Sequence, residues 1–218
     1  METMSTWSGD FTVKVSDGIF DDPWQEVKHF RVIGHGVNTA GVMGAGIAGQ
    51  IAHRFPSIVP HYIDACRNGF LKPGGATILL DEPSGIFIAN AASQDKPGKF
   101  AREEWMRESL LNVYRQICTH QFTLQQTTGS VPKFHVRLPL IGAGIGGIPP
   151  ERSADIIFDT VDKVKNIHSM MAGEKVTTTL YLRPGESHNK IVTEAFTRHY
   201  AEFPNGKYDT SSGRITPL

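Results

Sequence analysis

The chain has 218 residues, of which 39% are hydrophobic and 20% charged, a composition typical of one soluble globular domain. Its 22 basic and 22 acidic residues cancel, so a protein that binds duplex nucleic acid through a cationic surface is not indicated. The two cysteines form no C-x-x-C pair, no run approaches the ~20 apolar residues of a membrane helix, and no signal peptide is visible. We therefore expect a reduced, cytoplasmic protein with no metal, no cofactor and no membrane partner.

Apolar patterns in the first half of the chain predict short strands and helices. Alternation of apolar and polar residues marks the strands, and the spacing of Ile47, Ile51 and Phe55 marks the first helix, which Pro56 ends. Gly69 is expected to close the second helix as a left-handed cap. In chain order we expect strand, strand, helix, helix, strand and strand, at residues 11–15, 32–33, 47–55, 62–68, 76–80 and 86–89.

The second half continues the alternation. The polar segment Gln121–Pro132 is interpreted as a loop, and Pro149-Pro150 can only precede or open a helix. We expect helix, loop, strand, helix, strand and helix at residues 100–120, 121–132, 134–141, 151–166, 175–182 and 189–200. This order predicts an α/β fold with helices on both faces of a mixed, mostly parallel sheet. The domain would span 11–203, between a flexible segment 1–10 and a loose tail 204–218.

Two glycine-rich loops, Gly44-Ala-Gly46 and Gly142-Ala-Gly144-Ile-Gly146-Gly147, lie at strand-to-helix turns. Glycine at such turns can simply allow positive φ and tight packing. Each loop, however, places backbone N–H groups at or near a helix N-terminus, with no Cβ to hinder an anion. In an open α/β sheet this is also the edge at which ligands bind. Together the loops predict a clamp for a diphosphate that needs no lysine or arginine.

Other nucleotide sites fit less well. A Rossmann site expects G-x-G-x-x-G directly after the first strand, but here the first loop follows the second strand and offers only Gly44 and Gly46. No Gly-Lys-Ser/Thr occurs, so a Walker A loop is absent. The segment Lys96–Arg107 has basic and aromatic residues, but Glu103 and Glu104 dilute them and favour a solvated helix face over a nucleic-acid site.

The stretch Val32-Ile-Gly-His-Gly-Val-Asn-Thr-Ala-Gly-Val-Met-Gly-Ala-Gly-Ile-Ala48 resembles the ribose and phosphate segment of macro domains. Leu138-Pro-Leu-Ile-Gly-Ala-Gly-Ile-Gly-Gly147 resembles their second phosphate loop, and the likeness spans about residues 11 to 182. The form H-x-x-N-x-x-G-x-M-G-x-G-I-A is most similar to the branch of the terminal ADP-ribose glycohydrolase, the bacterial DNA ADP-ribosyl hydrolase antitoxins and the yeast ADP-ribose-1″-phosphate phosphatase. The resemblance implies a macro-domain-like three-layer α/β/α sandwich that binds ADP-ribose or a derivative.

The resemblance also implies roles for particular residues. Asp17 would accept the adenine amino group, although Asp21 or Asp22 could compete. Asn38 would bond the distal ribose. His35, three residues earlier, would act as a general acid or base, because its ordinary pKa of ~6.5 suits proton transfer; a structural histidine is the alternative. The ligand-binding set is Asp17, Gly44, Ala45, Gly46, Ile47, Ala48, Gly142, Ala143, Gly144, Ile145 and Gly146, and the catalytic set is His35 and Asn38.

Two departures from this branch bear on the reaction. The glycohydrolases it resembles carry a lysine just after the fourth strand, about where this chain has Asn90, with Lys96 and Lys99 a few residues on. The terminal glycohydrolase also has an acid in its second loop, where this chain has Gly146 and Gly147. We therefore expect hydrolysis of a 1″-linked group without a covalent lysine, from ADP-ribose-1″-phosphate or from ADP-ribosylated protein or nucleic acid. The alternative is a non-catalytic ADP-ribose reader or scavenger of a nucleotide signal.

Overall fold

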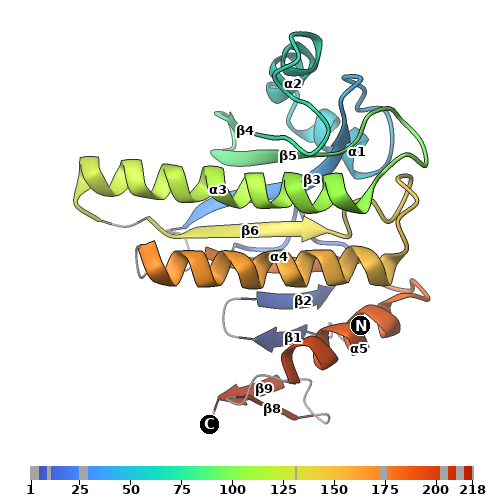
Figure 1. Ribbon diagram of the computed structural model, residues 1–218, viewed down its shortest axis with the longest axis vertical. Coiled ribbons are helices and arrows are strands. Elements are labelled where there is room, and N and C mark those ends of the chain that lie inside the picture. The colour runs from blue at the N-terminus through green and yellow to red at the C-terminus, as the bar shows by residue number, and fades with distance from the viewer. Residues whose placement is uncertain are drawn as a thin grey trace.

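A mixed sheet of seven strands runs through the middle of the molecule (Figure 1). The computed structural model describes residues 5–8, 11–24, 29–130, 132–171, 176–201, 206–209 and 214–217. The strands are β1 (Ser5–Ser8), β2 (Phe11–Val15), β3 (Phe30–Asn38), β4 (Ala76–Asp81), β5 (Ile86–Gln94), β6 (Phe134–Pro139) and β7 (Val176–Leu182). Their order across the sheet is β1-β2-β7-β6-β3-β5-β4. The five strands from β2 to β5 are parallel, and β1 and β4 close the two edges antiparallel, so the expected mostly parallel sheet is confirmed.

Helices cover both faces of this sheet. They are α1 (Gly46–Arg54), α2 (Ile58–Arg67), α3 (Glu103–Thr128), α4 (Pro150–Met171) and α5 (Asn189–Ala201). The main hydrophobic core lies on the side of α3, α4 and α5, where Phe158 of α4 and Phe196 of α5 pack on Phe11 of β2. On the opposite side, Ile51 of α1 and Ile58 of α2 pack on Ile33 of β3. The α/β/α sandwich is therefore confirmed.

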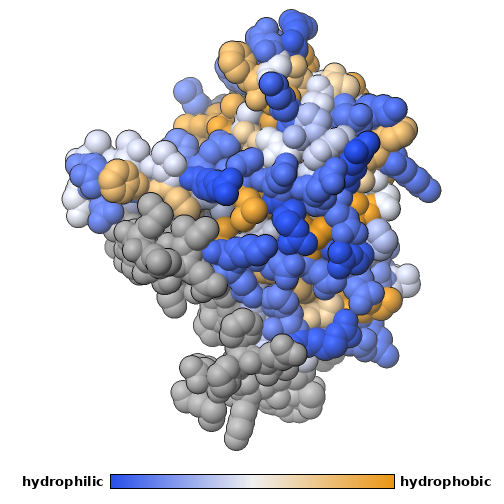
Figure 2. Space-filling model, viewed as in Figure 1, coloured by the Kyte–Doolittle hydropathy of each residue, from blue (hydrophilic) through white to orange (hydrophobic). Residues whose placement is uncertain are grey.

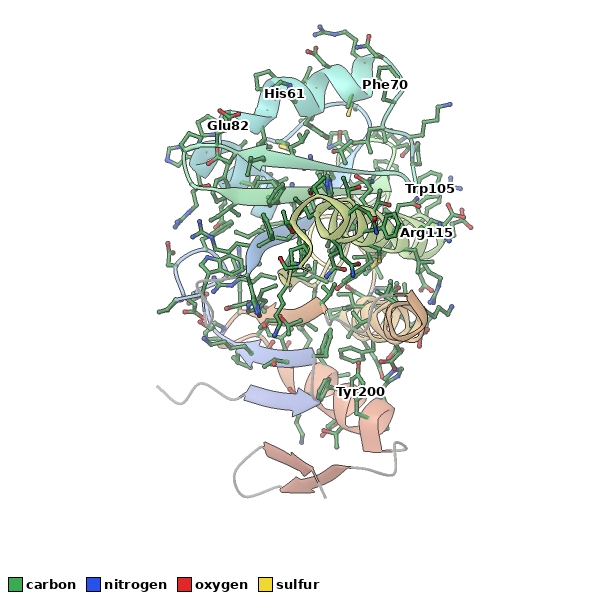
Figure 3. The ribbon with its side chains drawn as sticks, turned by 90° about the vertical axis from the view of Figure 1, so that its left-hand side faces the viewer. His61, Phe70, Glu82, Trp105, Arg115 and Tyr200 are labelled. Atoms are coloured by element: carbon green, nitrogen blue, oxygen red, sulfur yellow. The ribbon has the colours of Figure 1, made fainter. Side chains whose placement is uncertain are left out.

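The outward faces of the helices follow the polar half of each helical pattern. Figure 2 shows that the surface above α3 and α4 is mostly hydrophilic. Arg115, on the exposed side of α3, points away from the sheet, whereas Tyr200, near the end of α5, lies against Phe11 (Figure 3). Apolar residues at helical spacing thus determine which side of each helix meets the sheet.

The expected loop at 121–132 is wrong over most of its length, because α3 continues to Thr128. The segment lacks a strong apolar stripe, yet the Gln121 amide donates to the carbonyl of Pro132 at 2.9 Å, and the Thr128 hydroxyl donates to the carbonyl of Leu124 at 2.7 Å. Gly129, with φ of 72°, closes the helix as a left-handed cap. These polar contacts extend a helix that hydrophobic periodicity alone ends too early.

After Pro204, where we expected a loose tail, the described residues include two short paired strands, β8 (Gly206–Asp209) and β9 (Arg214–Pro217). Segment 1–10, expected to be flexible, contributes β1, which pairs antiparallel with β2. The carboxyl edge of the parallel strands is where β3, β5, β6 and β7 all end, and it holds both glycine loops.

Candidate functional site

A pocket of about 560 Å³ opens at the carboxyl edge of the parallel strands. Four segments form its walls: the end of β3 with the loop into α1, the end of β5, the loop between β6 and α4, and the segment after β7. The size suits a nucleotide-sized ligand. Both predicted glycine loops line it, so residues about 100 positions apart in sequence meet at one site.

The first loop ends at the N-terminus of α1. The N-cap residue is Ala45, which provides no side-chain cap, and the first turn contains no acidic residue. The first backbone donor bonded within the helix is Gly49, whose N–H bonds the carbonyl of Ala45 at 3.0 Å. The N–H groups of Gly46, Ile47 and Ala48 are therefore at the open end of the helix, where they and the helix dipole favour an anion.

The second loop faces the first. Ile148 N–H bonds the carbonyl of Gly142 at 2.9 Å, and the Ser153 hydroxyl of α4 holds the carbonyl of Ile141 at 2.7 Å. Within the described residues, the N–H groups of Gly144, Ile145 and Gly146 have no backbone acceptor. The Ile145 side chain reaches across, so that a Cβ on Gly46 would lie 3.3 Å from its Cδ1. The loops thus form two walls of one neutral, N–H-rich channel.

Gly146 and Gly147 leave no room for the loop acid of the terminal glycohydrolase. A Cβ on Gly146 would lie 2.6 Å from the carbonyl oxygen of Gly142 and 2.9 Å from the Cβ of Ala101. Gly147 has a φ of +85°, a backbone conformation that residues with a side chain rarely adopt, and a Cβ there would lie 3.1 Å from the Cβ of Lys99. The backbone of this loop therefore requires glycine where the terminal glycohydrolase has a carboxylate.

Asn38 lines the pocket, but its amide is occupied by the loop that follows it. Its Nδ2 donates to the carbonyl of Val42 at 2.7 Å, and its Oδ1 accepts from the Val42 N–H at 3.1 Å. Tyr62 of α2 donates its hydroxyl to the Asn38 carbonyl at 2.6 Å. Asn38 therefore determines the shape of the loop between β3 and α1, in addition to lining the site.

His35 is fully buried, and its side chain does not line the pocket. It lies between Ile33 and Val37 on the face of β3 that packs under α1 and α2. Its Nε2 is 2.8 Å from the Oδ1 of Asn90, which is its register partner on β5. Burial lowers the pKa of His35 to about 4, although the contact with Asn90 opposes the shift. This placement supports the structural alternative for His35 over a role in proton transfer.

The end of β5 places different residues at the pocket than sequence spacing suggested. Asn90 is buried and donates to the Thr77 hydroxyl at 3.1 Å, whereas Ser93 and Gln94 line the pocket. Lys96 stacks on the ring of Phe100 at 4.1 Å, and Lys99 packs beside Gly147. Among the residues that the structure describes, no lysine lines the pocket. A covalent lysine intermediate thus has no support from the geometry.

Asp17 follows β2 directly and is exposed, outside the pocket lining. Two residues earlier, Val15 pairs with Leu182, which does line the pocket. Of the possible competitors, Asp21 binds Arg54 at 2.7 Å and faces α1. Asp22 is paired with Lys14. Burial raises its pKa, but Lys14 together with hydrogen bonds from Tyr181 and Ser16 outweighs burial, so its pKa is lowered.

Arg137, which sequence patterns did not single out, holds the turn after β2 in place. It is buried on β6, and its guanidinium donates to the carbonyls of Ile19, Asp22 and Pro23 at 2.8 to 3.1 Å. It also stacks over Trp24 at 3.6 Å from the ring centroid. Through these Nη contacts Arg137 ties β6 to the segment after β2, which carries Asp17.

The segment after β7 adds the charged lining residues, none of which was expected from the sequence. These are Arg183, Glu186 and His188, next to Tyr181. Glu186 lies 3.9 Å from His188. Among the arginines whose side chains are described, Arg183 is the one whose guanidinium makes no ion pair, hydrogen bond or ring contact within the described part of the chain. Loop residues before a helix carry little periodic signal, which is why they were missed.

Within the described ranges there is no cluster of three or more His, Cys, Asp or Glu residues that could hold a metal ion. No helix in those ranges is both long enough and apolar enough to cross a membrane.

The fold and the pocket define an α/β/α domain in which two glycine loops face each other across a channel lined by backbone N–H groups. The family model for the macro domain matches residues 35–157, more than half of the chain. The chain therefore belongs to the macro domain family, as its motifs suggested.

Comparison with individual proteins agrees with this assignment. The DNA ADP-ribosyl glycohydrolase of Thermus aquaticus is 31% identical over 117 residues, which cover 52% of this chain and only 29% of that protein. The macrodomain of Thermus aquaticus DarG has a TM-score of 0.58 at 23% identity, covering 79% of this chain and 96% of that one. Thermosipho africanus DarTG in complex with ADP-ribose has a TM-score of 0.62 at 16% identity, covering 86% and 45%. At these identities the structures bear on the fold alone.

Proposed function

We propose that the chain binds ADP-ribose in this pocket, with the diphosphate held between the two glycine loops. The observation that carries the proposal is the pair of facing loops, each presenting backbone N–H groups at a helix end or in a tight turn. Membership of the macro domain family supports the choice of ligand, as does the complex of Thermosipho africanus DarTG with ADP-ribose. We expect micromolar affinity, on the order of −8 kcal/mol.

The ligand would lie along the pocket in one direction. The resemblance assigns the distal ribose to the end of β3, near Asn38, and the adenine to the turn after β2, near Asp17. Tyr181 and Arg183 line the pocket at the neighbouring end of β7, so they would flank the adenosine. Arg137 would hold the turn that carries Asp17 in place through its hydrogen bonds to the carbonyls of Ile19 and Asp22.

We further propose that the domain hydrolyses a group linked to the distal C1″, with water as the attacking group. The named activity of the Thermus aquaticus relative supports this reaction and suggests ADP-ribosylated DNA as one acceptor. ADP-ribose-1″-phosphate and ADP-ribosylated protein are the other substrates to compare. Without a lysine on the pocket wall, rate enhancement would come from positioning the substrate and the water, rather than from a covalent intermediate.

One observation favours a non-catalytic reader as the second candidate. In the described lining around Asn38, namely the ends of β3 and β5 and the residues beside them, there is no carboxylate, histidine or lysine. Such a wall can bind a sugar, but it offers no side chain for general acid or base catalysis at ordinary pKa values.

Substitution of Gly44 tests the site. A Cβ there meets its nearest neighbour, Cγ1 of Val42, only at 4.0 Å, and the residue has no positive φ. We expect Gly44→Glu to reduce ADP-ribose affinity more than about tenfold, because its carboxylate repels the diphosphate. The matched Gly44→Gln variant should retain much more affinity. Calorimetry that finds Gly44→Glu as tight as the wild type would refute the site.

Turnover separates the two candidate functions. The wild type would be incubated with ADP-ribose-1″-phosphate, mono-ADP-ribosylated protein and mono-ADP-ribosylated DNA, and released product measured by chromatography. A hydrolase releases product from at least one substrate, and Gly44→Glu loses that activity. Tight binding of ADP-ribose with no release from any of the three would establish the reader instead.

A further inference from the structure

Ser93 has a buried hydroxyl that no other group in the described structure satisfies. The residue is 1% exposed, and its Oγ has no hydrogen-bond partner. Buried hydroxyls are nearly always paired, so an unpaired one next to a pocket indicates a partner that arrives from the pocket. Ser93 lines the pocket at the end of β5, beside Asn38.

An irregularity in the sheet directs Ser93 to this position. Val37 pairs with Ala92 and Asn38 with Gln94, so Ser93 is the extra residue of a β-bulge between β3 and β5. Its carbonyl leaves the ladder and accepts the N–H of Arg102 at 3.0 Å. Bulges next to functional sites commonly redirect one side chain, and here the redirected side chain is the serine.

Gly36 lies directly beside this hydroxyl, where an added methyl group would be crowded. A Cβ on Gly36 would lie 3.0 Å from Ser93 Oγ, 3.0 Å from Cγ2 of Ile141 and 3.6 Å from the backbone nitrogen of Gly142. The hydroxyl therefore lies close to the start of the second glycine loop, on the part of the pocket wall that Gly36 and Ser93 share. A ligand oxygen that contacts this part of the wall would be near both the Ser93 hydroxyl and the backbone N–H of Gly142.

The Asn38 amide is oriented by the loop that follows it. Both ends of its amide are bonded to Val42, at 2.7 and 3.1 Å, and the Tyr62 hydroxyl is 3.4 Å from its Oδ1. The Gln94 amide donates to the carbonyl of Lys96 at 2.8 Å. Ser93 is thus a buried side chain at this end of the pocket whose hydroxyl makes no hydrogen bond within the described residues.

We propose that Ser93 binds a hydroxyl of the distal ribose and that Asn38 shapes the adjoining loop. The inference rests on the proposed function, since it assigns a contact to the ligand named there. It differs from the expectation from the sequence, in which Asn38 alone binds the distal ribose. Ser93 then determines specificity for a diphosphate that carries a second sugar.

Ser93→Ala tests the contact in the full chain. Removing an unpaired buried hydroxyl leaves the unfolding midpoint of the free protein unchanged or raised. Affinity for ADP-ribose falls roughly fivefold to tenfold, as for one lost hydrogen bond, while affinity for ADP, which lacks the distal ribose, stays the same. The matched control is Ser109→Ala: Ser109 is also buried, but its hydroxyl donates to Met106 within α3 at 3.0 Å, and its loss leaves both affinities unchanged.

Gly36→Ala tests the same part of the pocket wall by crowding it. Its Cβ would press on Ser93 Oγ and displace the ribose oxygen, so ADP-ribose binding falls more than in Ser93→Ala, with a folded protein verified by its unfolding transition. Ser93→Ala that binds ADP-ribose like the wild type, or that loses ADP equally, overturns the ribose assignment. Failure of the wild type itself to bind ADP-ribose, or indifference to Gly44→Glu, overturns the proposed function instead.

Discussion

Two buried histidines make the stability of the domain dependent on pH. Burial lowers the pKa of His35 to about 4, and burial with Arg137 nearby lowers the pKa of His135 to about 4. The unfolded chain titrates near 6.5, so between pH 6.5 and 4 it binds more protons than the folded one. The contribution of these two histidines to the free energy of unfolding is complete above pH 6.5 and is lost as the pH falls toward 4. His199, whose pKa is raised by Asp162, acts in the opposite sense.

His35→Gln should reduce this pH dependence. Between pH 7 and 5 the wild type should lose about 2 kcal/mol of unfolding free energy through His35, and the variant should lack that loss. Urea unfolding at several pH values measures the difference, and His199 cancels because both proteins carry it. The variant also separates structure from chemistry: a pH–rate profile that changes shape in His35→Gln would contradict the structural role.

The glycines of the second loop differ in how closely other residues pack around them. A Cβ on Gly146 would collide with the carbonyl of Gly142 and the Cβ of Ala101, and the Gly146 carbonyl accepts the N–H of Ala101 at 3.2 Å, which couples the loop to the segment before α3. Gly144 has nothing within 4 Å of a Cβ and no positive φ. Packing therefore restricts position 146 to glycine, whereas it leaves position 144 free to accept a side chain.

Alanine at these two positions should give opposite results. Gly146→Ala is expected to lower the unfolding free energy by about 1–3 kcal/mol, because its Cβ overpacks a rigid backbone. Gly144→Ala should be neutral or stabilise by up to about 1 kcal/mol, through reduced freedom of the unfolded chain. Denaturant unfolding of the pair measures both. Equal destabilisation would mean that the loop backbone differs from the one described.

The molecule as a whole is neutral, and in the proposed site the ligand's charge would be met mainly by backbone dipoles. The formal net charge is zero, and Arg183 is the one arginine or lysine on the described wall of the pocket. Dipoles at close range are screened by salt far less than separated surface charges. Binding of a dianionic ligand should therefore tolerate salt.

We expect ADP-ribose affinity to fall less than about tenfold between 0.05 and 0.5 M NaCl, because salt screens little beyond the Arg183 charge. Arg183→Gln should lower the affinity at low salt and flatten the remaining dependence. Calorimetry across this range provides the measurement. A loss of 100-fold or more would show that cations outside the pocket hold the ligand.

Local patterns were enough to predict the sandwich, most element positions and the two glycine loops. Apolar periodicity is visible in residues that lie close together in the sequence. Glycines at strand-to-helix turns indicate an anion site where parallel strands end at the same edge of a sheet. The family likeness was visible for the same reason, since the motifs of both loops are short and continuous. The end of α3 was misplaced because polar contacts, rather than an apolar stripe, extend it to Thr128.

Which polar side chains face the pocket was decided only in three dimensions. His35 and Asn38 are three residues apart on β3, yet one is buried under α1 and α2 and the other lines the pocket. The bulge that directs Ser93 inward arises from pairing between strands about 55 residues apart. Arg137 and Arg183 depend in the same way on segments distant in sequence. Strand register and side-chain packing set these orientations, and neither is encoded in a short stretch of chain.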